Sequence, residues 1–73
     1  METRFSIYKG CFGKEISNIE EVLVHTDLSL YEDAVTYLSR YCRSNNCNLK
    51  DYCIKQEQKE YTGWVAISKH IFL

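Results

Sequence analysis

The sequence predicts a single α+β domain in which one amphipathic helix packs on one face of an antiparallel sheet, in the order ββαββ. Two observations predict this class. Apolar residues recur at helical spacing once, near the middle of the 73-residue chain, and stretches rich in β-branched and aromatic residues lie on both sides of that segment. No repeat, low-complexity stretch or proline- or glycine-rich linker divides the chain, so residues 1–73 form one domain.

The first two strands are predicted from alternation and β-branched residues. Apolar and polar residues alternate over residues 4–9, and Gly10 and Gly13 then bracket a turn. Residues 21–26 carry three β-branched side chains and predict the second strand. On that strand, alternation places Val22 and Val24 on one face and Leu23 and His25 on the other.

The helix has the clearest signal in the chain. Ser29 and Glu32 form a capping box, which predicts a helix that begins at about Leu30. Asn45 and Asn46 tolerate the left-handed conformation of a helix end, so the helix should stop near Ser44. At about 100° per residue, seven apolar residues fall within an arc of roughly 140°: Leu30, Tyr31, Ala34, Val35, Leu38, Tyr41 and Cys42.

A second hairpin follows the helix. Residues 52–56 and 64–72 are the strand candidates, and polar residues and glycine gather at 58–63 to form the turn. Because residues 64–67 are all apolar, the last strand is predicted to be buried on both faces and central in the sheet. The sheet face opposite the helix is then partly open, to be covered by a partner or by a second copy of the chain in a homodimer.

Composition narrows the function classes. Nine basic against ten acidic residues give a net charge of −1 and a pI near 6.1, so the surplus of Lys and Arg typical of nucleic-acid binding is missing. The longest apolar run is four residues, far short of the ~20 that cross a bilayer. The first residues lack the pattern of a signal peptide. We therefore predict a cytoplasmic protein without a membrane partner.

The distribution of charge suggests a binding surface. Residues 15–33 contain six acids and no base. A row of carboxylates can imitate a phosphate backbone and occupy a basic channel on a partner, although acids near a helix N-terminus also complement the helix dipole. The predicted partner-binding residues are Glu20, Glu21, Asp27, Glu32, Asp33 and the flanking Tyr37.

Tyrosines support an interaction role, because tyrosine often anchors protein interfaces. The chain has six tyrosines and one tryptophan. Tyr31 and Tyr41 are predicted to point to the core. The remaining tyrosines, predicted to be partly exposed, are Tyr8, Tyr37, Tyr52 and Tyr61.

The cysteines and histidines do not form a recognised site. Cys11, Cys42, Cys47 and Cys53 are separated by 30, 4 and 5 residues, so no C-x-x-C pair exists. We predict four reduced thiols, no metal and no cofactor, with a zinc site completed by His25 or His70, or disulfides, as the alternatives. No nucleophile elbow, phosphate-binding glycine loop or zinc-protease motif is present, which predicts a protein that is not an enzyme.

The layout resembles a known class of small proteins. A capped helix at 29–43 lies between a short hairpin at 4–26 and a longer one at 52–72, without a catalytic motif. This arrangement is similar to small phage-encoded inhibitors of host defence, anti-CRISPR proteins among them. The resemblance spans the chain, concerns architecture only and transfers no residue role. It implies a small stable surface that binds a host protein or ribonucleoprotein complex and blocks its nucleic-acid site or its movement.

Two other functions remain as alternatives. The first is a small nucleic-acid-binding or regulatory protein that uses the basic residues of 4–14 and 40–55. The second is a thiol or zinc protein built on the four cysteines.

Overall fold

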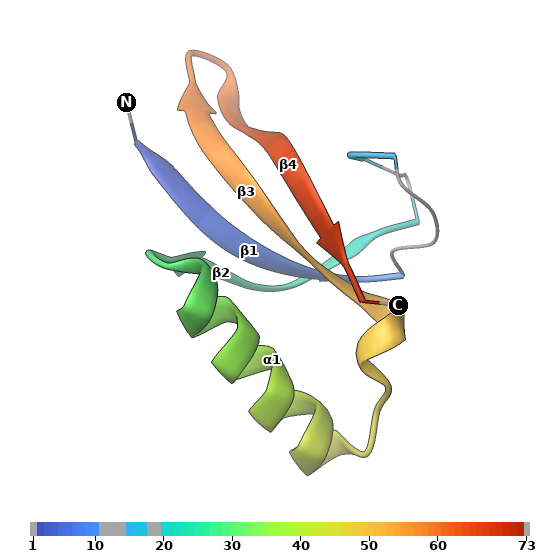
Figure 1. Cartoon of the computed structure of the whole chain (residues 1–73). Coiled ribbons are helices and arrows are strands. Elements are labelled where there is room, and N and C mark those ends of the chain that lie inside the picture. The colour runs from blue at the N-terminus through green and yellow to red at the C-terminus, as the bar shows by residue number, and fades with distance from the viewer. Residues whose placement is uncertain (1, 11–14, 18–19, 73) are drawn as a thin grey trace.

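The computed structural model describes residues 2–10, 15–17 and 20–72. It has four strands, one α-helix and one 3₁₀ turn, which are β1 (Thr3–Lys9), β2 (Val22–Leu28), α1 (Tyr31–Asn45), η1 (Leu49–Asp51), β3 (Tyr52–Glu60) and β4 (Gly63–Ile71). The strands form one antiparallel sheet in the order β2-β1-β3-β4, and α1 lies along one side of it (Figure 1). This confirms the predicted ββαββ α+β fold.

The position of β4 differs from the prediction. β1 and β3 are the central strands, and β4 is an edge, with Val65 45 % and Ile67 44 % exposed. The prediction was wrong because β3 reads as polar in sequence, yet Lys55 and Glu57 on it are buried. Apolar runs therefore did not distinguish the central strand from the edge strand.

The two ends of α1 are formed in different ways. At its start, β2 continues to Leu28 and the N-cap is the extended Leu30 (φ −123°, ψ 147°), which makes no side-chain capping hydrogen bond. The helix therefore begins one residue too late for Ser29 to cap it, and the predicted capping box does not form. At its end, Asn46 adopts the predicted left-handed conformation (φ 58°, ψ 41°).

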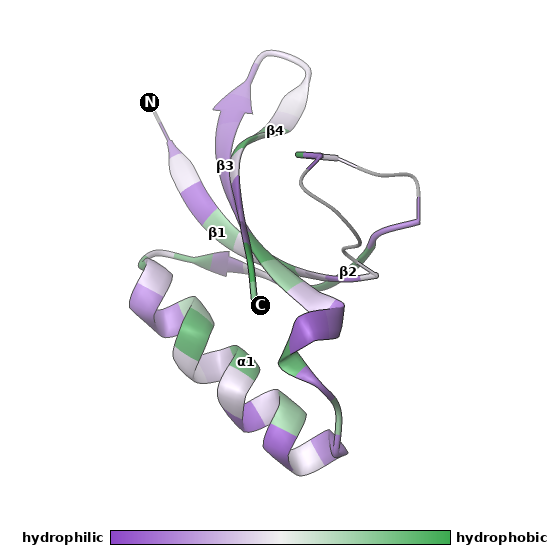
Figure 2. Ribbon diagram, turned by 45° about the vertical axis from the view of Figure 1, so that its right-hand side comes forward, coloured by the Kyte–Doolittle hydropathy of each residue, from purple (hydrophilic) through white to green (hydrophobic). Residues whose placement is uncertain are grey.

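The apolar core lies between α1 and the two central strands. Ile7 and Ile54, paired across β1 and β3, pack with Ala34 and Leu38 of the helix. Green apolar segments alternate with polar ones along α1 in Figure 2, as an amphipathic helix requires. Tyr52 is buried, whereas it was predicted to be partly exposed. It follows η1 directly as the first residue of β3, where it pairs with Lys9 of β1.

The buried face of α1 is narrower near the N-terminal end of the helix than predicted. Leu30 is exposed, and Tyr31 is at the margin of the core, where its ring meets Phe5 and His70 edge-on. Tyr41 packs against the core as expected.

β2 departs from strict alternation. Its pairing with β1 shifts register on both sides of Ile7, which lies opposite His25. Val24 packs against the core and the neighbouring His25 stacks on Tyr37 of the helix, with ring centroids 4.0 Å apart. The prediction that these two residues face opposite sides was wrong, because a bulge turns both toward the helix.

Gly10 closes the end of β1 as predicted. Its φ is +84°, and a Cβ there would lie 3.0 Å from the carbonyl oxygen of Glu20. Its N–H donates to the carbonyl of Asp51 at 2.8 Å. Both ends of the β1–β2 connection therefore meet at a position that only glycine fits. Gly13 lies outside the described residues.

Candidate functional site

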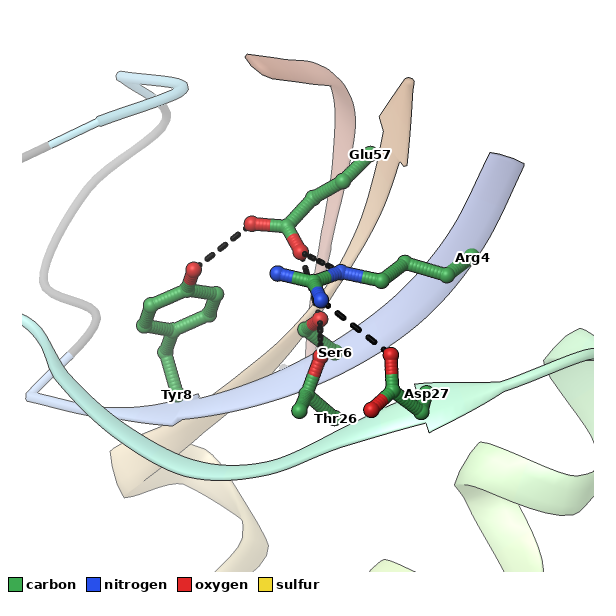
Figure 3. Close-up of polar contacts among 6 residues, drawn as sticks. All are labelled: Arg4, Ser6, Tyr8, Thr26, Asp27 and Glu57. Atoms are coloured by element: carbon green, nitrogen blue, oxygen red, sulfur yellow. Dashed lines mark hydrogen bonds and ion pairs between the residues drawn. The ribbon is translucent and has the colours of Figure 1, made fainter. Parts of the chain in front are cut away.

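The sheet face opposite α1 carries a network of polar side chains centred on Glu57. The Glu57 carboxylate accepts from Arg4 Nε at 2.9 Å, from Ser6 Oγ at 2.5 Å and from Tyr8 Oη at 2.6 Å. Because the Ser6 hydrogen goes to Glu57, the Thr26 hydroxyl donates to Ser6 at 2.7 Å. Figure 3 shows these groups converging from β1, β2 and β3.

The network holds Glu57 as a carboxylate. Burial alone would raise its pKa, but hydrogen bonds from Ser6, Tyr8 and Arg4 and the positive charge of Arg4 outweigh it and lower the pKa. Burial and the bond to Glu57 raise the pKa of Tyr8. A carboxylate whose oxygens are occupied by three donors is a poor proton acceptor, so the chemistry of this cluster is structural.

A second ion cluster lies next to it. Glu21, which precedes β2, accepts from Lys55 Nζ at 2.6 Å and pairs with Lys69 Nζ at 2.8 Å. Lys69 also donates to the carbonyl of Glu15 at 2.8 Å, and Lys55 lies 4.5 Å from the centre of the Tyr8 ring. These contacts fasten the β1–β2 connection to the sheet. We call the residues of both clusters the ion-paired face: Arg4, Ser6, Tyr8, Glu21, Lys55, Glu57 and Lys69.

The ion pairs remove several cations from the free surface. The side chains of Lys55 and Lys69 are only 4 % and 2 % exposed, and Arg4 is shared between Glu57 and Asp27. Arg4 begins the first of the two basic stretches of the nucleic-acid alternative, and Lys55 ends the second. In the folded chain both are paired with carboxylates.

An open groove lies on the other side of the molecule, between α1 and the end of β2. It has a volume of about 540 Å³. Tyr37 and Tyr41 stack within it, with centroids 6.3 Å apart, and His25 stacks on Tyr37 from β2. The lining residues of this α1–β2 groove come from one side of the helix and from Leu28: Leu28, Asp33, Thr36, Tyr37, Arg40, Tyr41, Ser44 and Asn45.

The six predicted site residues are divided among three places. Asp33 and Tyr37 line the groove together. Asp27 and Glu32 are exposed on either side of the link between β2 and α1. Glu20 is exposed in the β1–β2 connection, and Glu21 is buried between Lys55 and Lys69.

The sequence prediction did not include the other groove residues, although a signal for them exists. Asp33, Thr36, Tyr37, Arg40 and Tyr41 recur at helical spacing beside the apolar stripe. A second periodic stripe of aromatic and polar residues, beside the apolar stripe of a core helix, indicates a candidate binding surface. This stripe includes Thr36, Arg40 and Tyr41 as well as Tyr37.

The cysteines differ from the prediction of four free thiols. Cys42 and Cys47 are free, whereas Cys53 is disulfide-bonded. Cys11 lies outside the described residues. Among residues 2–10, 15–17 and 20–72, no group of three His, Cys, Asp or Glu side chains is arranged to hold a metal ion.

Comparisons with known proteins add no relatives. A scan against protein-family models, a search of curated proteins and a search of solved structures each gave no match. In the described part of the chain, no helix has the length and apolar character needed to cross a membrane.

Proposed function

We propose that this chain is a small non-enzymatic protein-interaction module that binds an extended segment of a partner in the α1–β2 groove. The observation that carries the proposal is the groove itself, about 540 Å³ in volume, with stacked tyrosines in it and polar residues around them. Aromatic residues within a polar rim are typical of interface centres.

The edge strand beside the groove favours an extended partner. β2 is an edge of the described sheet, and Leu28 at its end lines the groove. Val22 and Leu23, at the other end of the strand, are exposed apolar residues on the same edge. A strand edge next to a helix provides backbone hydrogen bonds from the strand and side-chain pockets from the helix. A partner segment that pairs with β2 as an added strand would therefore use both the β2 edge and the α1–β2 groove.

The charges around the groove favour a basic partner segment at one end. Asp27 near the end of β2 and Glu32 and Asp33 in the first turn of α1 lie close together along the chain, while Arg40 and Arg43 lie near the end of α1. For the partner we propose a host protein or ribonucleoprotein complex that processes nucleic acid, blocked by a phage or mobile-element inhibitor of the anti-CRISPR type. The acidic end would then occupy a basic surface that otherwise holds phosphate.

The proposed place of action is the cytoplasm of the host cell. A disulfide at Cys53 is uncommon in that compartment. The thiol count of protein that is alkylated during lysis therefore tests the location.

A capture experiment with two matched variants tests the groove. Thr36→Arg places a long cation in the groove, and Thr62→Arg makes the same change at the exposed β3–β4 turn. Tagged wild type and both variants are incubated with nuclease-treated host lysate. We expect a stoichiometric protein to be retained by wild type and Thr62→Arg and lost from Thr36→Arg. Equal retention by all three excludes the groove as the interface.

Two further measurements separate the alternatives. Reversal of Glu32 and Asp33 to Lys should weaken capture by more than the fraction of a kcal/mol expected from the helix dipole alone. Titration with single- and double-stranded oligonucleotides at physiological salt should give no binding. Binding that falls steeply with salt would favour the nucleic-acid alternative.

A further inference from the structure

Two free cysteines meet at the C-terminal end of α1. The N–H groups of Asn46 and Cys47 both donate to the carbonyl of Cys42, the latter at 3.0 Å, and Asn46 is left-handed. The bond from Cys47 is the six-to-one bond of a Schellman helix end, in which the side chains of these two positions commonly make contact. That contact is normally between two hydrophobic residues. In this chain both positions are cysteine and both thiols are free.

The pair lies beside a wide, open depression of the surface. Cys42 and Cys47 line it together with Ser39, Arg43 and Asn46. Cys42 belongs to the buried core, whereas Cys47 is only half-buried. A reagent that approaches from solvent therefore reaches Cys47 more easily than Cys42.

The surroundings shift the pKa values of the two thiols in opposite directions. Burial, then the hydrogen bond with Cys47, raises the pKa of the Cys42 thiol to about 12. Burial alone would also raise the pKa of Cys47, but hydrogen bonds from the Cys42 thiol and the Tyr52 hydroxyl, with the charge of Lys9, lower it. A thiolate that is accessible and hydrogen-bonded is the reactive form of cysteine.

We propose that Cys42 and Cys47 form a thiol–disulfide exchange site for small disulfides, with Cys47 as the attacking residue and Cys42 as the resolving one. The Cys47 thiolate attacks one sulfur of a disulfide RSSR, forms the mixed disulfide and releases RS⁻, which takes a proton from water. Cys42 then gives its proton to water and attacks the Cys47 sulfur, which breaks the mixed disulfide and releases a second RS⁻, and this thiolate takes a proton from water. Two protein thiols are oxidised to one disulfide, and RSSR is reduced to two RSH.

This site is separate from the proposed interaction groove. It uses the helix end and Tyr52, and it predicts chemistry whether or not a partner binds. Failure of the capture experiment above therefore does not affect it.

Trypsin allows the test on the full chain, because each described cysteine falls in its own peptide: 41–43 for Cys42, 44–50 for Cys47 and 51–55 for Cys53. Native protein is incubated with oxidised glutathione, quenched with N-ethylmaleimide and digested. We expect a linked pair of the first two peptides, with two hydrogen atoms fewer than their sum. Absence of this pair while the chain stays folded overturns the proposal.

Single variants assign the two roles. Cys42→Ser should accumulate a stable glutathione adduct on Cys47, and Cys47→Ser should give none on Cys42. An adduct that forms on Cys42 instead reverses the assignment and overturns it. In wild type, time-resolved alkylation should modify Cys47 about tenfold faster than Cys42 at neutral pH, a measurement that requires no variant.

A variant at Tyr52 tests whether Cys47 is activated, separately from whether the chain folds. Tyr52→Phe removes the hydroxyl that donates to Cys47, so the pH profile of Cys47 alkylation should move to higher pH. Tyr41→Phe, a neighbouring tyrosine on the core side, serves as the matched control and should leave the profile in place. Identical profiles for Tyr52→Phe and wild type would show that Cys47 is not activated as proposed.

Discussion

The two faces of the sheet are buried to the same degree by opposite chemistry. On the helix side, Ile7 and Leu38 are fully buried by apolar packing. On the ion-paired face, the side chains of Glu21 and Lys69 are 3 % and 2 % exposed, yet both are charged. Helix α1 covers the first face, and on the second face Glu21 and the carbonyl of Glu15 contact Lys55 and Lys69.

The difference shows how such a small chain closes both faces. A 73-residue domain buries a limited apolar area, and α1 covers one side of the sheet. Ion pairs bury the other side at a cost, because each ion loses its hydration and depends on its partner. Loss of volume on the helix-covered face should therefore cost stability independently of salt, whereas loss of one charge on the ion-paired face should cost more, because it leaves buried charges without a partner.

The largest expected effect is that of Glu21→Gln. The change leaves the ammonium groups of Lys55 and Lys69 without a negative partner in a buried position. We expect the free energy of unfolding to fall by about 4 kcal/mol, measured by urea denaturation.

The control for this variant is Glu15→Gln, an exposed carboxylate in the same connection, which should have no measurable effect. A triple change, Glu21→Leu with Lys55→Met and Lys69→Met, should recover much of the loss, since apolar side chains replace the whole cluster. If Glu21→Gln is as stable as wild type, the two faces do not differ as described.

Leu38→Ala makes the corresponding change on the helix-covered face. Leu38 is fully buried against Ile7 and Ile54, so its truncation removes apolar contacts and leaves a cavity. The expected loss is about 3 kcal/mol. Unlike the loss from Glu21→Gln, it should not change with salt, because no charge is involved; urea denaturation at two salt concentrations compares the variants. A salt-dependent loss would contradict this interpretation.

Local sequence patterns predicted the helix-covered face well. The apolar stripe through Ala34, Leu38 and Cys42 identified the buried side of α1, and Asn46 identified its end. These signals depend on residues a few positions apart, so they can be read along the chain. The capping box at Ser29 failed because the end of β2, and not the local motif, fixed the first turn.

The ion-paired face could not be predicted in the same way. Arg4 meets Glu57, and Glu21 meets Lys55 and Lys69, only through the register of three strands. In sequence, Glu21 lies within a run of six acids without a base, so it reads as an exposed charge. The groove was half-predicted, through Asp33 and Tyr37, because its lining also depends on where β2 ends.

Glu57→Gln should have a smaller effect than Glu21→Gln. The amide oxygen can still accept from Ser6 and Arg4, the Tyr8 hydroxyl can accept from the amide NH2 that replaces the second oxygen, and Arg4 keeps Asp27 as a partner. We expect a loss of about 2 kcal/mol at neutral pH, measured by thermal and urea unfolding. A loss as large as that of Glu21→Gln would show that both clusters act as one unit.

The same variant should change the acid dependence of stability. Because the folded state lowers the pKa of Glu57 below 4.5, its stabilisation is present above the unfolded-state pKa and is lost as pH falls through the folded-state pKa. Wild type should therefore lose stability more steeply than Glu57→Gln below about pH 4. If the stability of the two proteins falls equally with pH, Glu57 is not the source of the acid dependence.

The smallest effect is expected at the rim of the ion-paired face, for Asp27→Asn. Asp27 is 75 % exposed and 3.2 Å from Arg4, and exposed ion pairs contribute little, so the loss should be below about 0.5 kcal/mol. Asp27 also has φ +64°, which asparagine tolerates and alanine does not. Asp27→Ala should therefore cost about 1 kcal/mol more. Urea denaturation of the two variants measures both losses of unfolding free energy. Equal losses would mean that the charge of Asp27, and not its backbone conformation, determines the effect. The sharp dependence on charge would then extend from the buried clusters to the surface.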